Sequence, residues 1–306
     1  MNRIGGWALV LAVRVLFLGI RLLPVRVAGA LGAGIGRAAY LLLRRHRRIA
    51  LGNLARIYPG RGRRWRAWTA RESFAELGRS MFELPHVFLR SRRFLLSRVR
   101  VEGEAVFRRA MERGDGVVLI AAHHCNWELG ALMFSMLGYG SSIIYRPMEQ
   151  EPLEYFLRAC RQRFGAVMRP RTAGMRWLRE DLRAGRSIAV MIDQHMSQGE
   201  QVPFLGHLAN STTLPAAVVR KYGVPLFGVA IEREGRGFSF RLRFWPIPLP
   251  EREQDRKLDL YRATEAIHDS YAPVIHRRPE LWMWLHRRWY ILEHDPALAE
   301  AVHAAP

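Results

Sequence analysis

The sequence predicts an α/β fold in which a mostly parallel central sheet is covered by helices. From residue 101 onward, short apolar segments rich in β-branched residues alternate with longer segments of helical character. This alternation is typical of parallel strands joined by crossover helices. The chain has 306 residues, 49% of them hydrophobic, which suffices for one large α/β domain with an appendage.

The individual elements follow from the same periodicity. The predicted strands are residues 117–122, 141–146, 187–192, 225–231 and 238–245. The predicted helices of this region are residues 128–137, 151–164, 172–184, 212–222 and 258–277. The last two strands are joined by residues 232–237, which include two glycines, so they are expected to form a hairpin at one edge of the sheet.

The chain divides into three regions by composition. Residues 1–27 are predicted to form a membrane-anchoring or interfacial helix, residues 28–100 a basic helical region, and residues 101–306 the α/β catalytic region. Within the second region, residues 29–58 are expected to form a Gly/Ala-rich helix and then a basic helix, and residues 68–90 a further helix.

Positive charge is concentrated at the N-terminal end. The net charge is +21, and residues 1–100 contribute +18 of it, with 21 Arg, no Lys and three acidic residues. Such a block beside apolar segments implies an anionic partner, which could be a membrane, a phosphorylated lipid, an acidic carrier protein or nucleic acid. Nucleic acid is the least favoured, because no helix-turn-helix, RNA-recognition or zinc-finger signature is present.

The apolar segment Gly5–Val25 is long enough for a membrane-spanning helix. Arg3, Arg14 and Arg21 would lie on nearly one line of that helix, so it could instead lie flat in the interface with its arginines toward the headgroups. A cleaved signal peptide is less favoured because Arg14 interrupts the apolar run. The basic residues that follow place the catalytic region on the cytoplasmic face of the membrane in both arrangements.

His123 and Glu128 are the candidate catalytic pair. His123 follows the predicted strand at 117–122, and Glu128 falls in the first turn of the next predicted helix. A tight turn between them could join the imidazole to the carboxylate, and such a pair can make a hydroxyl group nucleophilic. The alternative is a histidine satisfied by backbone atoms and a glutamate favoured by the helix dipole.

Two other chemistries are weaker candidates at this segment. A metal site is disfavoured, because His123 and His124 should point to opposite sides of an extended strand and no second Cys/His cluster exists. Cys125 lacks an activating partner that would make it a nucleophile. The two cysteines, Cys125 and Cys160, indicate a reducing compartment rather than a disulfide framework.

Several segments resemble, in order, the bacterial lipid A biosynthesis (lauroyl/myristoyl) acyltransferase family, which belongs to the glycerolipid-type acyltransferases with an H-x4-D/E motif. The segment His123–Glu128 resembles its His-x-x-Asn-Trp-Glu motif, although this chain has Cys125 where Gly is common. The other matching segments are Ala50–Leu54, Ile144–Pro147, Asp193–Gln194, Val202–Phe204, Ser211–Thr213 and the Trp-rich Pro279–Trp289.

The resemblance implies transfer of a fatty acyl chain from an acyl carrier protein thioester to a hydroxyl of a lipid A precursor at the inner membrane. His123 would be the general base and Glu128 would orient it. No metal or other cofactor is expected, because a thioester is already activated. The expected partners are acyl carrier protein or acyl-CoA as donor, a glycolipid acceptor and an anionic membrane surface.

Five further residues are predicted to contact substrate. Arg146 and the pair Asp193–Gln194 each follow a predicted strand, so they should emerge at the same sheet edge as His123. Arg146 could bind a phosphate or pair with a carboxylate. Asn126 could stabilise an oxyanion or cap the following helix. Arg287, in the C-terminal block, is expected to reach an anionic headgroup.

Alternative functions stay open at this point. A related acyltransferase could use acyl-CoA and another glycolipid, such as a phosphatidylinositol mannoside. The same residues could release the acyl group to water as a hydrolase. A catalytically silent membrane-binding protein is disfavoured by the joint presence of His123, Glu128, Arg146 and Asp193.

Overall fold

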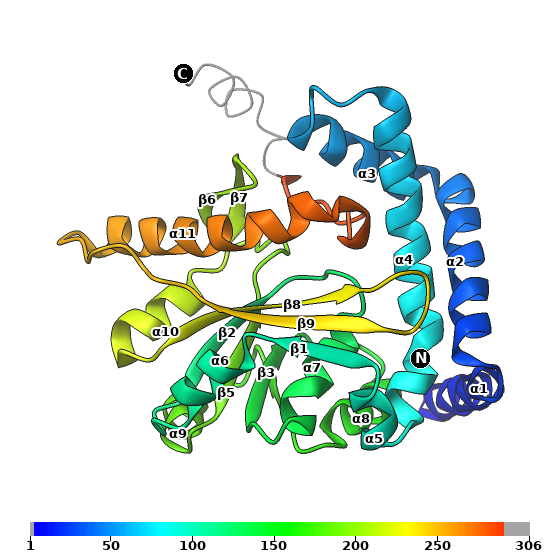
Figure 1. The fold of residues 1–306 in the computed structure, drawn as a ribbon, viewed down its shortest axis with the longest axis horizontal. Coiled ribbons are helices and arrows are strands. Elements are labelled where there is room, and N and C mark those ends of the chain that lie inside the picture. The colour runs from blue at the N-terminus through cyan, green and yellow to red at the C-terminus, as the bar shows by residue number, and fades with distance from the viewer. Residues whose placement is uncertain (1–2, 291–306) are drawn as a thin grey trace.

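The structure, a computed structural model, describes residues 3–290 and is built around one mixed sheet (Figure 1). Seven strands lie in the order β1-β9-β8-β2-β5-β3-β4. Neighbours are parallel except for the antiparallel hairpin β8–β9. The strands are β1 (Val99–Glu102), β2 (Val117–Ala121), β3 (Ser141–Tyr145), β4 (Val167–Pro170), β5 (Ser187–Met191), β8 (Leu226–Arg233) and β9 (Phe240–Pro246). The predicted fold class and the predicted hairpin are confirmed, although the hairpin is not at the edge, because β1 adds to β9.

Helices cover both faces of this sheet. They are α5 (Arg92–Leu96), α6 (Glu104–Met111), α7 (Trp127–Met136), α8 (Glu151–Gln162), α9 (Arg176–Arg183), α10 (Leu214–Tyr222), α11 (Arg256–Arg277) and the 3₁₀ turn η1 (Pro279–Leu281). Side chains of β2 alternate between two cores: Val118 and Ile120 join the core under α9, α10 and α11, whereas Val117 and Leu119 join the core under α5, α6 and α7. The continuous apolar run of β2 therefore reflects burial on both faces.

Four strands and two helices were not predicted from the sequence. The strands β1 and β4 have only four residues each and carry arginines, and α5 and α6 are short helices with two arginines each. The strands β6 (Glu200–Phe204) and β7 (His207–Ser211) form a separate antiparallel pair that includes Pro203. Elements this short and polar produce no clear periodicity.

The N-terminal region consists of four helices: α1 (Arg3–Leu22), α2 (Val25–Leu42), α3 (Arg44–Ile57) and α4 (Arg63–Leu89). The predicted first helix, residues 1–27, is divided because α1 ends before Pro24, which fixes its own φ and disfavours a helical conformation in the residue before it. Within residues 3–290, no helix combines the length and hydropathy that crossing a membrane requires.

Helices α2 and α4 pack side by side through glycines (Figure 1). Gly32 and Gly36 of α2 face Gly78 and the backbone of Phe74 on α4. A Cβ atom at Gly36 would overlap the carbonyl oxygen of Phe74, and one at Gly32 would overlap that of Gly78. The small residues thus allow the two backbones to approach closely, which turns the larger side chains of α2 away from α4.

This packing predicts opposite effects for two glycines of the same helix. Gly36→Ala should lower the free energy of unfolding by about 2 kcal/mol, because the new methyl group must displace the α4 backbone. Gly34→Ala is the matched control, since nothing lies within 4 Å of its would-be Cβ, and it should raise stability by roughly 1 kcal/mol through helix propensity. Urea unfolding followed by circular dichroism measures both, and equal effects would contradict the close packing.

Candidate active site

Strand register brings His123 and Asp193 together at the carboxyl edge of the sheet. Ala121, the last residue of β2, pairs with Met191, the last residue of β5, and each candidate lies two residues further along. The His123 Nδ1 atom is 2.8 Å from Asp193 Oδ1, and the His123 backbone N–H donates to Asp193 Oδ2 at 2.7 Å. Two contacts from one carboxylate therefore orient both the ring and the backbone of the histidine.

The surroundings of Asp193 keep its carboxylate ionised. The side chain is buried, and the indole N–H of Trp282 donates to Oδ2 at 2.8 Å. Burial acts to raise the pKa of Asp193, but the attraction of His123 and the hydrogen bonds from His123 and Trp282 outweigh it and lower the pKa. An ionised Asp193 accepts a hydrogen bond from Nδ1–H, so the free lone pair of His123 lies on Nε2.

Gln194 lies at that second nitrogen. Its side-chain Nε2 is 3.3 Å from the Nε2 atom of His123, and the side chain is exposed. The Trp127 ring packs edge-on against the imidazole, with centroids 5.1 Å apart. His123 is therefore oriented on one side by Asp193 and open on the other, where Gln194 is the nearest polar group.

The predicted contact between His123 and Glu128 is wrong. The Glu128 carboxylate binds Arg161 of α8 through two hydrogen bonds, of 2.5 and 3.0 Å. Glu128 lies in the first turn of α7, which faces α8, and Asp193 already occupies the Nδ1 atom of His123. Asp193 therefore has the orienting position that was expected for Glu128, whose part in the reaction stays a prediction.

Asn126 caps α7 and does not face the open side of the site. Its Oδ1 atom accepts from the Leu129 N–H at 3.1 Å, and its Nδ2 donates to Glu83 at 2.9 Å. The side chain is buried with both polar atoms satisfied. Of the two roles expected for Asn126, the helix cap is the one that the structure contains, and contact with substrate stays a prediction.

The turn before α7 has an uncommon backbone. Cys125 has φ of +54°, the left-handed region in which glycine is favoured. A glycine, which the resemblance leads one to expect here, would adopt this geometry without strain. Burial raises the pKa of the Cys125 thiol well above its usual value, which disfavours the thiolate that a nucleophile requires.

The C-terminal Trp-rich block closes the site from one side. Trp282 and His124 form an isolated antiparallel β-bridge. On either side of it, the Met283 N–H donates to the His123 carbonyl at 3.1 Å, and the Cys125 N–H donates to the Leu281 carbonyl at 2.7 Å. The Asn53 amide of α3 binds the Trp284 and His286 carbonyls, both at 2.9 Å. Segments that are far apart in the sequence thus hold the histidine turn in place.

Arg288, which was not predicted, is the buried arginine of this block. Its guanidinium donates to the Asn210 carbonyl and the Ser211 hydroxyl, each at 2.6 Å, and burial lowers its pKa to about 10. The predicted Arg287 stacks on Tyr290, and its contact with an anionic headgroup stays a prediction. The two adjacent arginines have the same chemistry, and only the fold shows which of their side chains points inward.

His286 adds a second contact between the block and the sheet edge. Burial lowers the pKa of His286 to about 4, so the ring is neutral near pH 7. Its Nε2 atom can therefore accept the His195 backbone N–H, at 2.8 Å. This contact positions the chain directly after Asp193 and Gln194.

Arg146 lies at the end of β3, beside β5, and its side chain is exposed. No hydrogen bond or ion pair joins it to another described residue, so the expected salt bridge is not formed and a phosphate role stays a prediction. His124 lies buried against the Ile231 carbonyl, away from His123, as predicted. Within residues 3–290, no group of three His, Cys, Asp or Glu side chains is placed to hold a metal ion.

The structure places a histidine–aspartate pair at the carboxyl edge of a mostly parallel sheet, an arrangement that suits acyl transfer, and the family match assigns the chain to the O-acyltransferases. The chain matches the model of the bacterial lipid A biosynthesis acyltransferases over residues 3–290 and belongs to that family.

Curated relatives agree with this assignment. The chain is 26% identical over 287 residues to a lipid A biosynthesis lauroyltransferase of Escherichia coli, covering 92% of this chain and 91% of the relative. It is also 26% identical to a palmitoleoyltransferase of that organism, over 92% and 91% of the two chains. A myristoyltransferase is 24% identical, over 87% of this chain and 82% of the relative.

The first prediction from this site concerns Asp193. Asp193→Asn should lower kcat for acyl transfer by about 10²- to 10⁴-fold, because the amide cannot stabilise the imidazolium and permits the wrong tautomer. Asp269→Asn, a change of the same kind on the exposed surface of α11, should leave kcat unchanged. Retention of full kcat by a folded Asp193→Asn variant would contradict the orienting role.

The second prediction concerns the pair of Glu128 and Arg161. Either Glu128→Gln or Arg161→Gln should lower the free energy of unfolding by about 2 kcal/mol, because each leaves a partly buried charge without its partner. The double variant should recover part of that loss. Chemical denaturation of all four proteins gives the coupling energy, and additive losses would show that the pair does not act as a unit.

Proposed function

We propose that the protein transfers a fatty acyl chain from an acyl carrier protein thioester to a hydroxyl group of a lipid A precursor. The observation that carries this proposal is the oriented pair of His123 and Asp193 at the sheet edge, in a chain of the lipid A acyltransferase family. The reaction takes place at the cytoplasmic face of the inner membrane, where a basic surface can meet both an acidic donor and an anionic lipid.

In the proposed reaction, His123 is the general base. Its Nε2 atom takes the proton of the acceptor hydroxyl while the oxygen attacks the thioester carbonyl. Asp193 holds the Nδ1 proton and stabilises the imidazolium that forms. The tetrahedral intermediate then collapses, the C–S bond breaks, and the imidazolium gives its proton to the leaving thiolate, which restores the neutral histidine.

The intermediate needs a donor for its negative oxygen. The first-turn N–H groups of α7, at Trp127 and Glu128, are our candidates, because the first N–H groups of a helix have no partner within the helix. Gln194, beside Nε2, is placed to bind the incoming hydroxyl. Arg146, exposed at the end of β3, supplies a positive charge for a phosphate of the acceptor.

The donor assignment rests on charge. The first 100 residues have a net charge of +18, and acyl carrier protein is acidic. Acyl-CoA with another glycolipid acceptor, such as a phosphatidylinositol mannoside, is the second candidate, since the phosphates of acyl-CoA would contact the same arginines. A direct comparison of the two donors separates these possibilities.

The test uses detergent-purified protein, acyl carrier protein thioesters of several chain lengths and a tetra-acylated lipid A precursor, with products weighed by mass spectrometry. We expect one added acyl mass, and a loss of about 10²- to 10⁴-fold in rate for His123→Ala. His46→Ala, at an exposed position of α3, is the matched control.

Three outcomes count against the proposal. Transfer from acyl-CoA alone, or to another glycolipid alone, would replace the assignment with the second candidate. Free fatty acid without acylated acceptor would indicate a hydrolase. Activity that survives His123→Ala would remove the base from the mechanism.

A further inference from the structure

Helix α1 presents an almost entirely apolar face to the outside of the molecule. Its inner face packs on the body, where Phe17 contacts Phe88 of α4 and Phe156 of α8. Its outer face consists of exposed hydrophobic side chains on every turn, and Leu22 is 86% exposed. These residues are Trp7, Leu9, Leu11, Val15, Leu16, Leu18 and Leu22.

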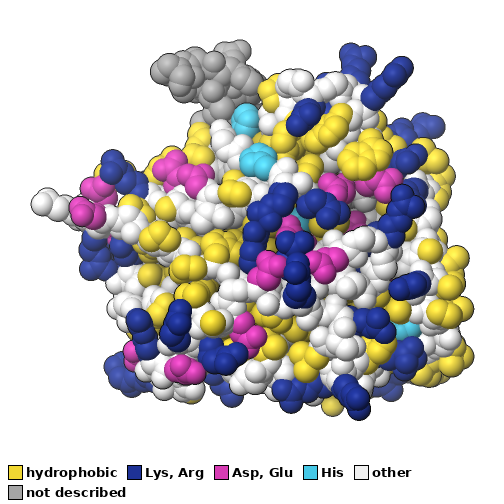
Figure 2. All heavy atoms as spheres, viewed as in Figure 1, with side chains coloured by type: hydrophobic (Ala, Val, Ile, Leu, Met, Phe, Trp, Pro, Cys, Tyr) yellow, Lys and Arg dark blue, Asp and Glu magenta, His cyan; other side chains and the backbone are white. Residues whose placement is uncertain are grey.

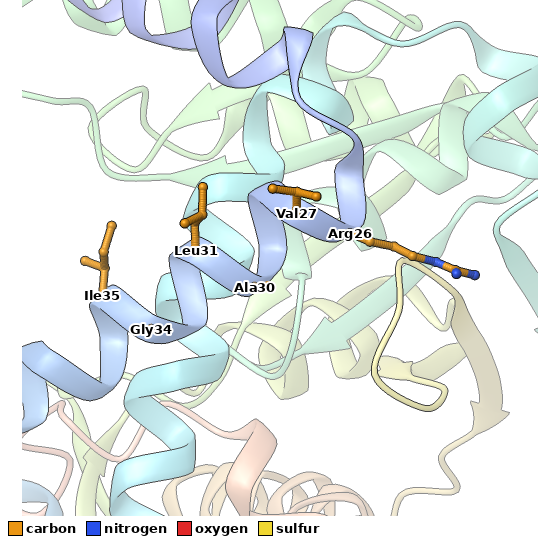
Figure 3. Close-up of a pocket in the computed structure, with 6 residues that line it drawn as sticks. All are labelled: Arg26, Val27, Ala30, Leu31, Gly34 and Ile35. Carbon is orange, nitrogen blue, oxygen red and sulfur yellow. The ribbon is translucent and has the colours of Figure 1, made fainter.

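Helix α2 continues this apolar surface. Because its glycines face α4, its larger side chains point outward, and Val27, Leu31 and Ile35 are exposed one turn apart (Figure 3). Together with Arg26, Ala30 and Gly34 they form one open, largely apolar face of α2. The helix ends in three consecutive exposed leucines, Leu41–Leu43, of which Leu42 is 77% exposed. A contiguous apolar surface of this kind marks an interaction site.

The charged side chains of helices α1, α2 and α3 are all positive. The first acidic residue of the chain is Glu72, so α1, α2 and α3 contain none. Arg14 and Arg21 lie at the rim of α1, where Arg14 stacks on Phe156 and Arg21 is near Arg90. Directly after the leucines, Arg44, Arg45 and Arg48 are exposed and pair with no described carboxylate. Figure 2 shows hydrophobic and basic side chains together along the edge that α2 occupies.

We propose that the outer faces of α1 and α2, with the turn Leu41–Leu43, form one surface that inserts shallowly into the interface of an anionic bilayer. This α1–α2 face combines apolar side chains, which enter the acyl boundary, with rim arginines at the depth of the headgroup phosphates. The inference rests on the membrane location within the proposed function and names the surface that provides it.

The charges favour a bilayer over a second copy of the chain. A symmetric dimer through the α1–α2 face would bring two arginine rims together, and α1, α2 and α3 contain no carboxylate to neutralise them; like charges in contact are unfavourable. An anionic lipid surface neutralises the same rims. Because α1 packs on α8 and on the C-terminal end of α4, α1 and α2 can lie in the membrane plane while the sheet stays outside it.

The apolar part of the proposal is tested by vesicle flotation of the full chain. Val27→Glu/Leu31→Glu should weaken binding to vesicles of phosphatidylcholine with roughly a third of phosphatidylglycerol by at least about tenfold, because each change places a charge in the apolar layer. Val106→Glu on α6 is the control, since Val106 is 41% exposed and Val27 43%, yet α6 lies outside the face. Equal binding by the double variant and the unaltered protein would overturn the α1–α2 face.

The basic rim of the proposed surface is tested with a charge-reversal variant. Arg44→Glu/Arg45→Glu should weaken binding to the anionic vesicles by about fivefold or more per residue, and leave binding to pure phosphatidylcholine unchanged. Arg109→Glu/Arg113→Glu, an exposed pair around the end of α6, should have a smaller effect. High salt should reproduce the loss seen with Arg44 and Arg45. Equal losses from the two charge-reversal pairs would contradict a defined basic rim.

Two further measurements separate the test of the membrane surface from the test of the acyl-transfer reaction. Acyl transfer assayed in detergent micelles should be unchanged in Val27→Glu/Leu31→Glu, because the α1–α2 face does not include His123 or Asp193. Failure of transfer in the unaltered protein would refute the proposed reaction while vesicle binding still decides the surface. A dimer in light scattering that this variant dissociates would assign the face to a second copy and overturn the membrane proposal.

Discussion

The buried guanidinium of Arg233 holds the N-terminal helices to the sheet. At the end of β8, it donates to Glu76 and Glu83 of α4 through five hydrogen bonds of 2.7 to 3.2 Å, with none of the three side chains appreciably exposed. Burial acts to lower the pKa of Arg233, but the two glutamates outweigh it and raise the pKa. Removing one partner would leave an uncompensated buried charge, which costs about 3–5 kcal/mol.

The same two glutamates position the turn that carries His123. Glu83 accepts from the Asn126 amide, which caps α7, and Glu76 accepts from the Cys125 thiol. The turn that contains His123 is thus held by hydrogen bonds to α4 on one side and to the Trp-rich block on the other. This arrangement explains how Cys125 keeps a left-handed backbone. The contacts with Glu76 and Glu83, together with the hydrogen bond from the Cys125 N–H to the Leu281 carbonyl, fix a conformation that costs roughly 1–2 kcal/mol for a non-glycine residue.

Arg288 shows why Asp193 remains available to His123. A buried arginine near a buried aspartate would ordinarily form an ion pair, but the donors of Arg288 are directed to backbone carbonyls of β7 and the β5 end and to Ser211. The carboxylate of Asp193 therefore keeps its contacts with the histidine and Trp282. Because Arg288 and Asp193 do not form an ion pair, the ionised aspartate remains available to the His123 imidazole. An ionised partner is what a histidine base requires.

Strand periodicity was sufficient to predict the sheet edge at which the site forms, because His123 and Asp193 each directly follow a buried parallel strand. The partner of His123 was predicted wrongly, since spacing along the chain favoured Glu128, five residues away, over Asp193, seventy residues away. Pairing of β2 with β5 decides between them, and register is a property of the fold rather than of either segment. The Arg233 cluster was missed for the same reason: Glu76 and Glu83 share a helix face, but nothing local identifies their partner.

The proposed membrane surface is one helix layer away from the catalytic turn. Helix α8 packs against α1 through Phe156 and carries Arg161, which holds Glu128 at the start of α7. The Glu128–Arg161 pair of the H-x4-E motif therefore lies between the helix that we place at the bilayer and the helix whose N-terminus we propose to bind the oxyanion. On this view Glu128 acts through position rather than proton transfer, since it ties α7 to the lipid-bound layer while Asp193 serves the base.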